Sequence, residues 1–168
     1  MREQDPQLRA KNFEEVACGY SLEDALRESE RCLMCPDEPC IAGCPVGINI
    51  PGFIQKIGEK NFRGAYDILT DTNLLPSICG RVCPQENQCE GVCTVGDSLE
   101  AVAIGRLERF VGDTAIKEGW VNIPYIEPNR FRVGIVGSGP AGMACAADMA
   151  KAGCDVTVYE AFHQPGGV

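Results

Sequence analysis

The feature that most constrains this chain is its cysteine content, eleven cysteines among 168 residues. Eight of them fall in two blocks, Cys32 to Cys44 and Cys79 to Cys93, while Cys18, Cys145 and Cys154 stand alone. The N-terminal sequence MREQDPQLRAKNFEE is charged and lacks the apolar run of a secretory signal. Because thiols stay reduced in the cytosol, a disulfide framework is disfavoured. We therefore expect a cytoplasmic protein that uses thiolates for metal or redox chemistry.

Composition excludes several classes of function. The 24 acidic residues outnumber the 15 basic ones and give a formal charge of −9, whereas nucleic-acid binding requires a basic footprint. No apolar run approaches the roughly 20 residues of a membrane span. With His163 as the single histidine, no hydrolytic Ser/His/Asp or Cys/His set is predicted. We accordingly predict no nucleic-acid partner, no membrane association and no catalytic side chain.

The spacing within the two blocks is typical of iron–sulfur proteins. Block one reads C-x2-C-x4-C-x3-C-P, and block two reads C-x3-C-P-x4-C-x3-C. Close runs of this kind, often with proline after the last cysteine, supply thiolates to iron–sulfur clusters. Paired zinc sites usually show two C-x2-C knuckles, and only one is present, so zinc is the weaker alternative and disulfides the weakest. The spacing predicts two 4Fe–4S clusters.

The proline after Cys44 indicates how the thiolates are shared. In two-cluster ferredoxins the cysteine that precedes proline ligates the other cluster. We therefore expect Cys44 to bind the other cluster rather than the cluster that its own block holds. Cys32, Cys35 and Cys40 would then hold one cluster together with one thiolate from block two.

Hydrophobic periodicity predicts helices on either side of the cysteine blocks. The blocks themselves are predicted to be loops. The predicted helices cover 21–33, 51–59, 61–70 and 98–112. The first begins at a capping box formed by Ser21 and Asp24, and its buried stripe is expected to be Leu22, Ala25, Leu26, Ser29 and Leu33. The second is expected to have an apolar face of Phe53, Ile54 and Ile57.

The last predicted helix carries a carboxylate in its apolar stripe. The stripe is Ala101, Ile104, Glu108 and Val111, and Arg106 and Arg109 point elsewhere. Burial of an unpaired carboxylate is costly. Glu108 therefore needs a cation as partner or must stay at the edge of the core.

The C-terminal region changes character after a predicted linker at 118–129. The strand FRVGIVG, the loop GSGPAG, the helix MACAADMAKAG and the strand DVTVYEA form one βαβ unit. Gly137, Gly139 and Gly142 give G-x-G-x-x-G, which lets a pyrophosphate approach the helix N-terminus. Glu160, 23 residues after Gly137, would bind the adenosine ribose. The alternative is a purely structural turn.

Two strands and one helix cannot cover both faces of a parallel sheet. We therefore expect the 168 residues to be a fragment of a longer polypeptide. The alternative is a short protein that borrows the rest of its sheet from a partner.

Three segments of the chain resemble an N-terminal iron–sulfur domain that is shared by three relatives. The segments are CPVGINIPGFI, CGRVCPQENQCEGVC and VAIGRLERF. These relatives are the glutamate synthase small subunit, dihydropyrimidine dehydrogenase and the large subunit of NADH-dependent reduced ferredoxin:NADP oxidoreductase. The N-terminal MREQDPQLRAKNFEEVACGY is most similar to the third. The resemblance implies an α-helical domain with two 4Fe–4S clusters at 1–117. A linker follows at 118–129. The first βαβ unit of a truncated Rossmann-like FAD-binding domain then covers 130–168.

The resemblance also implies the metal ligands. The cluster far from the flavin would be held by Cys32, Cys35, Cys40 and Cys93. The nearer cluster would be held by Cys44, Cys83, Cys89 and Glu108. Cys79 is then left without a role, although a count of eight thiolates would use it, so Cys79 remains the rival of Glu108.

The cofactor site and the function follow from the same resemblance. An FAD site is implied by Gly137, Ser138, Gly139, Pro140, Ala141, Gly142, Glu160, Gly166 and Gly167. The NADPH site would lie beyond Val168. The implied function is electron transfer between NADPH, FAD and a partner oxidoreductase subunit, a ferredoxin- or NADH-linked flavoprotein. The alternatives are a glutamate synthase small subunit, whose partner is the large subunit, and a non-enzymatic cluster-bearing docking subunit.

Residues outside these sites receive simple roles. The three isolated cysteines, Cys18, Cys145 and Cys154, are expected to be small buried hydrophobes. His163 is expected to be an exposed loop histidine.

Overall fold

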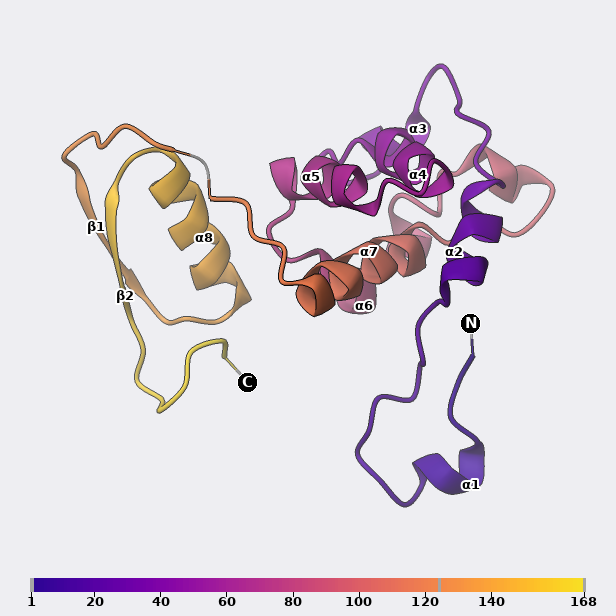
Figure 1. Cartoon of the computed structure of the whole chain (residues 1–168), viewed down its shortest axis with the longest axis horizontal. Helices are drawn as coiled ribbons and strands as arrows, with labels where there is room; N and C mark the ends of the chain where they lie inside the picture. Colours follow the sequence, from indigo (N-terminus) through magenta and orange to yellow (C-terminus); the bar gives the residue numbers. More distant parts are fainter. Residues whose placement is uncertain (1, 124, 168) are drawn as a thin grey trace. The chain divides into compact units, whose positions relative to one another are not determined.

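A computed structural model describes residues 2–123 and 125–167, which divide into two compact units, Met1–Trp120 and Val121–Val168 (Figure 1). Residue 124 of the predicted linker and residue 168 of the predicted flavin domain lie outside the described residues. The order of a helical unit followed by a βαβ unit confirms the predicted fold class. None of the described helices is long and apolar enough to cross a membrane.

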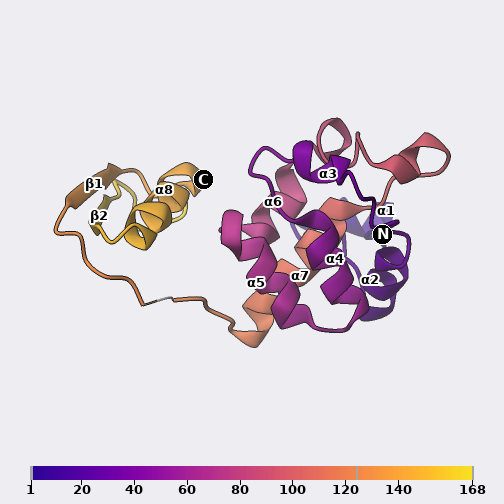
Figure 2. The same cartoon turned by 90° about the horizontal axis from the view of Figure 1, so that it is seen from above.

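The first unit is built from short helices around α7 (Figure 2). The helices are α1 (Pro6–Arg9), α2 (Leu22–Ser29), α3 (Pro39–Ala42), α4 (Ile50–Gly58), α5 (Phe62–Thr72), α6 (Pro76–Val82) and α7 (Ile104–Glu118). Two 3-10 turns are present: Gln85–Asn87 lies in the second cysteine block and Thr94–Asp97 follows it directly. Helix α7 packs against α6, α5 and α2, and α4 packs against α5.

The core lies where α4, α5 and α7 meet. Phe53, Ile57, Leu69, Leu107 and Val111 are fully shielded from solvent. The predicted apolar face of α4 is therefore confirmed. The predicted capping box at Ser21 and Asp24 is also present.

Helix α2 is shorter than predicted. It ends at Ser29, so Cys32 lies in the turn after the helix. Leu22 and Leu33, which were expected on the buried stripe, are exposed.

Helix α7 begins later than predicted, at Ile104 rather than at 98, and continues to Glu118. The preceding segment is tied to α2 instead. The Glu28 carboxylate accepts the Ala103 N–H at 2.9 Å, and Arg31 donates to the Ala101 carbonyl at 3.2 Å. The backbone of this segment thus forms hydrogen bonds with the side chains of Glu28 and Arg31 rather than within a helix.

The second cysteine block is not all loop, because Cys79 lies on α6. Pro76 can start a helix, since its missing N–H would be unsatisfied there in any case. Two glycines let α6 approach α7 closely. A Cβ on Gly80 would lie 2.6 Å from the Arg109 backbone nitrogen, and one on Gly112 would lie 2.5 Å from the Ser77 nitrogen. This packing brings Cys79 of α6, and Cys83 just after it, beside Glu108.

The second unit is the predicted βαβ unit. Strands β1 (Arg132–Val136) and β2 (Asp155–Tyr159) pair in parallel, with helix α8 (Pro140–Lys151) as the connection. His163 is exposed, as predicted.

The prediction for the isolated cysteines is wrong. Cys18 and Cys145 are exposed, and Cys154 is only partly buried. Helix α8 has no buried residue, and Cys18 lies in the exposed N-terminal segment, so neither cysteine has a core to pack into.

Candidate functional site

Four cysteines from both blocks meet at one cavity in the helical unit. Cys32, Cys35 and Cys40 line it together with Cys93, which comes from the second block. The other walls are largely apolar, from Leu33, Pro39, Ile50, Pro51, Ile54, Val95, Val102 and Ile104. The free volume is about 20 Å³, so an occupant larger than a water molecule must spread the four thiols. We call this cavity the Cys93 cavity.

A second cavity lies between α6, α7 and the segment after α3. It is lined by Cys44, Cys79, Cys83, Cys89 and Glu108. Its free volume is about 110 Å³, well above the 10–15 Å³ that one water molecule needs. We call it the Glu108 cavity. The structure thus separates the predicted ligands into the two expected groups, and it places Cys79 beside Glu108.

The cavity thiols are biased towards their neutral form. Burial raises the pKa of Cys40 and Cys83 to about 11 and that of Cys89 to about 12. Burial likewise raises the pKa of Cys32 and Cys79. A metal group must therefore displace protons from these thiols, which makes its binding pH-dependent.

Glu108 is a buried carboxyl group that faces thiols. It is 6% exposed, and burial raises its pKa to about 7, while a hydrogen bond from Asn73 works in the opposite direction. The sequence predicted either a cation partner or an edge position. The side chain lies in the core, so the edge position is wrong, and it accepts a hydrogen bond from the amide of Asn73. A carboxyl oxygen among thiols is a chemically suitable fourth ligand for iron.

Neither set of cavity ligands is arranged around a single metal ion. Within residues 2–123 and 125–167, no group of three or more His, Cys, Asp or Glu side chains is close enough to hold one metal ion. Tetrahedral zinc requires its thiolates at about 2.3 Å from one centre. The ligands of the Glu108 cavity surround a free volume of about 110 Å³, whereas those of the Cys93 cavity surround about 20 Å³.

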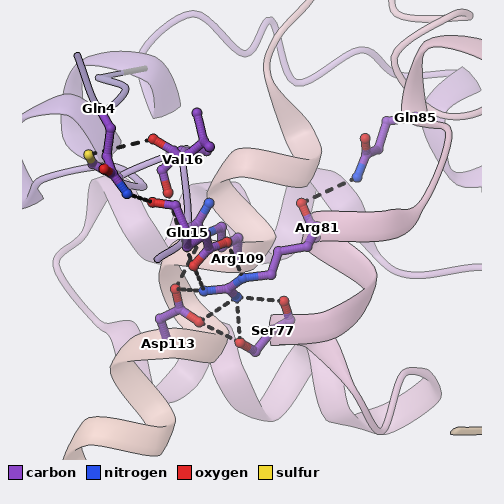
Figure 3. Close-up of polar contacts among 11 residues, drawn as sticks. Gln4, Glu15, Val16, Ser77, Arg81, Gln85, Arg109 and Asp113 are labelled. Atoms are coloured by element: carbon purple, nitrogen blue, oxygen red, sulfur yellow. Dashed lines mark hydrogen bonds and ion pairs between the residues drawn. The ribbon is translucent and has the colours of Figure 1, made fainter. Parts of the chain in front are cut away.

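A polar cluster ties the Glu108 cavity to the N-terminal segment (Figure 3). Its members, Glu15, Ser77, Arg81, Arg109 and Asp113, form what we call the Arg81 cluster. Arg81 donates to Glu15 at 2.7 Å and to Asp113 at 2.7 and 2.8 Å. Arg109 pairs with Glu15 at 3.0 Å and with Asp113 at 3.3 Å.

Sequence reasoning missed this cluster. It placed Arg109 off the apolar stripe, yet Arg109 is 6% exposed and donates to the Ala17 carbonyl at 2.9 Å. The i,i+4 spacing of Arg109 and Asp113 is the one local signal of it.

The glycine loop of the second unit closes around Ser138. This residue is buried, and its N–H and hydroxyl donate to the Glu160 carboxylate. The hydroxyl accepts the Gly166 N–H at 3.0 Å. These contacts gather the glycine loop, Glu160 and the C-terminal glycines at the start of α8. Hydrogen bonds from Ser138, above all, lower the pKa of Glu160 to about 2, so the carboxylate is ionised.

The glycines of this loop have distinct conformations. Gly137 has φ +93°, which favours glycine. A Cβ on Gly142 would lie 2.1 Å from the Gly137 carbonyl oxygen, whereas one on Gly139 would meet nothing within 4 Å. Pro140 and Ala141 begin α8. The loop therefore leaves an open approach to the helix N-terminus, which can accept a phosphate group.

Comparison with protein families matches each unit. The family described as dihydropyrimidine dehydrogenase domain II, 4Fe-4S cluster, matches residues 9–120. The NAD(P)-binding Rossmann-like domain family matches residues 135–168.

Similar proteins cover almost the whole chain. UacF of Escherichia coli is 40% identical over 162 residues, which are 95% of this chain and 25% of UacF. The glutamate synthase [NADPH] small chain of Halomonas elongata is 38% identical over 171 residues, 98% of this chain and 36% of that protein. The NAD-dependent dihydropyrimidine dehydrogenase subunit PreT of Salmonella typhimurium is 36% identical over 155 residues, 92% of this chain and 38% of PreT. The chain thus spans about a quarter to two fifths of these relatives.

Proposed function

The chain belongs to the family of the dihydropyrimidine dehydrogenase domain II, 4Fe-4S cluster, and we propose that it is the electron-transfer part of an NAD(P)H-dependent iron–sulfur flavoprotein oxidoreductase. The observation that carries the proposal is the separation of the predicted ligands into two cavities, each lined by cysteines from both blocks. One set of thiols and one mixed set of thiols and carboxyl group would give two clusters of different character.

We assign Cys32, Cys35, Cys40 and Cys93 to one 4Fe–4S cluster. The second cluster takes Cys44, Cys83, Cys89 and Glu108. Bound clusters accept and release single electrons, and the protein sets their surroundings. The walls of the Cys93 cavity are largely apolar, and the α6–α7 contact brings Cys83 and Glu108 of the second set together.

We further propose that the second unit begins an FAD site. Ser138 holds Glu160 ionised next to the glycine loop, where the carboxylate can accept hydrogen bonds from a ribose. A flavin can take two electrons from NADPH and release them singly. The NADPH site belongs to a part of the protein outside these residues.

Two physiological reactions remain candidates for the complete protein. Similarity to the Halomonas elongata small chain favours a glutamate synthase small subunit, with a large subunit as partner. The N-terminal segment MREQDPQLRAKNFEEVACGY favours transhydrogenation with a ferredoxin- or NADH-linked flavoprotein. Both use the same two cavities, so the partner subunit decides between them.

The test is anaerobic purification of the full-length gene product, with iron, acid-labile sulfide, zinc and flavin measured together. About eight irons and eight sulfides per chain, with bound flavin, are expected. Stoichiometric zinc without sulfide would refute the proposal. Clusters without flavin would indicate the docking subunit instead. Assays of NADPH-dependent glutamate formation with a large subunit, and of ferredoxin reduction, then distinguish the two reactions.

A further inference from the structure

One side chain contacts both rivals for the last ligand position of the Glu108 cavity. Asn73, the residue that follows α5, is 7% exposed and lines this cavity. Its Nδ2 donates a short hydrogen bond, 2.5 Å, to Oε1 of Glu108. Its Oδ1 accepts from Sγ of Cys79 at 3.4 Å.

The orientation of the Asn73 amide is fixed by the backbone. The N–H of Leu75 donates to Oδ1 of Asn73 at 3.0 Å. Because a backbone N–H can only donate, the amide oxygen must face Leu75 and Cys79, and the amide nitrogen must face Glu108. The roles of the two ends of the side chain therefore cannot be exchanged.

This orientation gives Glu108 and Cys79 different hydrogen-bonding environments. The amide N–H engages only Oε1 of Glu108, so Oε2 keeps its lone pairs for another partner. The sulfur of Cys79, by contrast, is hydrogen-bonded to Oδ1 as the donor. The amide oxygen that faces Cys79 has no hydrogen to donate, so it cannot stabilise this sulfur as an iron-binding thiolate.

We propose that Asn73 is the positioning residue that presents Glu108 to the second cluster and holds Cys79 back from it. The inference rests on the proposed function, since it concerns the choice between two ligands of the same cluster. Without the amide, Glu108 loses its partner in an apolar cavity and Cys79 is released beside it.

The experiment separates the two ends of the Asn73 side chain. Asn73→Asp keeps an oxygen for Leu75 and removes the N–H that Glu108 accepts. Asn61→Asp is the matched control, because Asn61 lies at the other end of α5 and uses only its oxygen, which accepts the Gly64 N–H. The double variant N73D/E108Q restores a hydrogen bond with donor and acceptor exchanged.

The readouts, on anaerobically purified full-length protein, are iron and sulfide content, the EPR spectrum of the reduced clusters and their midpoint potentials. For Asn73→Asp we expect the spectrum and potential of one cluster to shift, because Glu108 loses its hydrogen-bond donor, while the retained oxygen still faces Cys79. Asn73→Ala removes both ends of the side chain and releases Cys79, so in that background Cys79→Ala should remove about four irons per chain, whereas Cys79→Ala alone should remove none. If Asn73→Asp itself loses about four irons, N73D/E108Q should restore them. Asn61→Asp should change nothing.

The proposal fails if Asn73→Asp leaves spectrum and potentials unchanged, or if its iron loss is not restored in N73D/E108Q. It also fails if Cys79→Ala alone removes the cluster, because Cys79 is then the native ligand. Failure of the proposed function looks different. In that case the unsubstituted protein would not contain the expected eight or so irons per chain, and the proposed role of Asn73 would be refuted as well.

Discussion

The guanidinium of Arg81 forms a two-point ion pair with the carboxylate of Asp113, with Nη1–Oδ1 and Nη2–Oδ2 distances of 2.7 and 2.8 Å. Arg81 lies between Cys79 and Cys83, and Asp113 lies on α7 beyond Glu108. The pair therefore fixes the two helices that line the Glu108 cavity relative to each other.

Replacement of Arg81 should destabilise the helical unit. Arg81→Met leaves Glu15 and Asp113 without their principal partner, and we expect unfolding free energy to fall by about 2 kcal/mol. Arg81→Lys should recover only part of this loss, because an ammonium cannot bind both carboxylates as a fork. Denaturant unfolding under anaerobic conditions measures both effects.

Lys56→Met is the control for this prediction. Lys56 pairs with Glu59 at 2.7 Å on an exposed surface, where one pair contributes about 0–1 kcal/mol. Equal losses for Arg81→Met and Lys56→Met would show that the Arg81 cluster has no special role.

The contribution of Arg81 should depend on pH in the acid range. Hydrogen bonding from Arg81 lowers the pKa of Glu15. Burial of Asp113 works against ionisation, but hydrogen bonds from Arg81 and Ser77 outweigh it and lower that pKa too. Since both folded-state pKa values lie below the unfolded values of 4.5 and 3.8, the stabilisation is complete above those values and is lost as pH falls through the folded ones.

Unfolding of the metal-free protein at pH 7 and at pH 3 checks this sign. The stability difference between the unsubstituted protein and Arg81→Met should be large at pH 7 and smaller at pH 3. A difference that grows towards pH 3 would contradict the assigned charges.

The two cavities should lose their clusters independently. Cys35→Ser and Cys89→Ser each remove one ligand from a different cavity, so each should lower the iron content from about eight to about four per chain. The EPR signals that remain in the two variants should differ and should sum to the original spectrum. Identical residual spectra would mean that the ligands are shared differently from this assignment.

Glu108→Ala and Cys79→Ala test the eighth ligand directly. Glu108→Ala should lose or alter the second cluster, because the cavity then lacks its only carboxylate among the described residues. Cys79→Ala should keep about eight irons. Loss of iron in Cys79→Ala alone would reverse the assignment.

Local sequence patterns predicted the elements whose stabilising contacts are local. The face of α4 with Phe53 and Ile57 follows helical periodicity, and the βαβ unit follows strand and glycine signals. The start of α7 was mispredicted because Glu28 and Arg31, about 70 residues earlier, bind the segment before it. No periodicity within a window of 11–18 residues can report such a contact.

The candidate site shows the same limit. Spacing indicated that block one needs one more thiolate, but only a family resemblance singled out Cys93 for it. Asn73 was missed because its partner Glu108 is 35 residues away. Arg81 was missed because Glu15 and Asp113 are 66 and 32 residues away. These contacts arise from the packing of α6 on α7, which depends on glycines whose importance is visible only in three dimensions.

The last prediction separates folding from dinucleotide binding at two glycines of the same loop. In Gly142→Ala the new Cβ would lie 2.1 Å from the Gly137 carbonyl oxygen, a backbone atom that cannot move aside cheaply. This variant of the full-length protein should lose stability by about 1–3 kcal/mol and lose its flavin. In Gly139→Ala the Cβ meets nothing within 4 Å and φ is −63°, so stability should change by less than about 0.5 kcal/mol. Flavin content should nevertheless fall, because the second glycine of this motif lets the backbone approach the pyrophosphate. Thermal unfolding and flavin absorbance measure the two effects, and a Gly139→Ala protein that binds flavin like the unsubstituted one would place the pyrophosphate elsewhere.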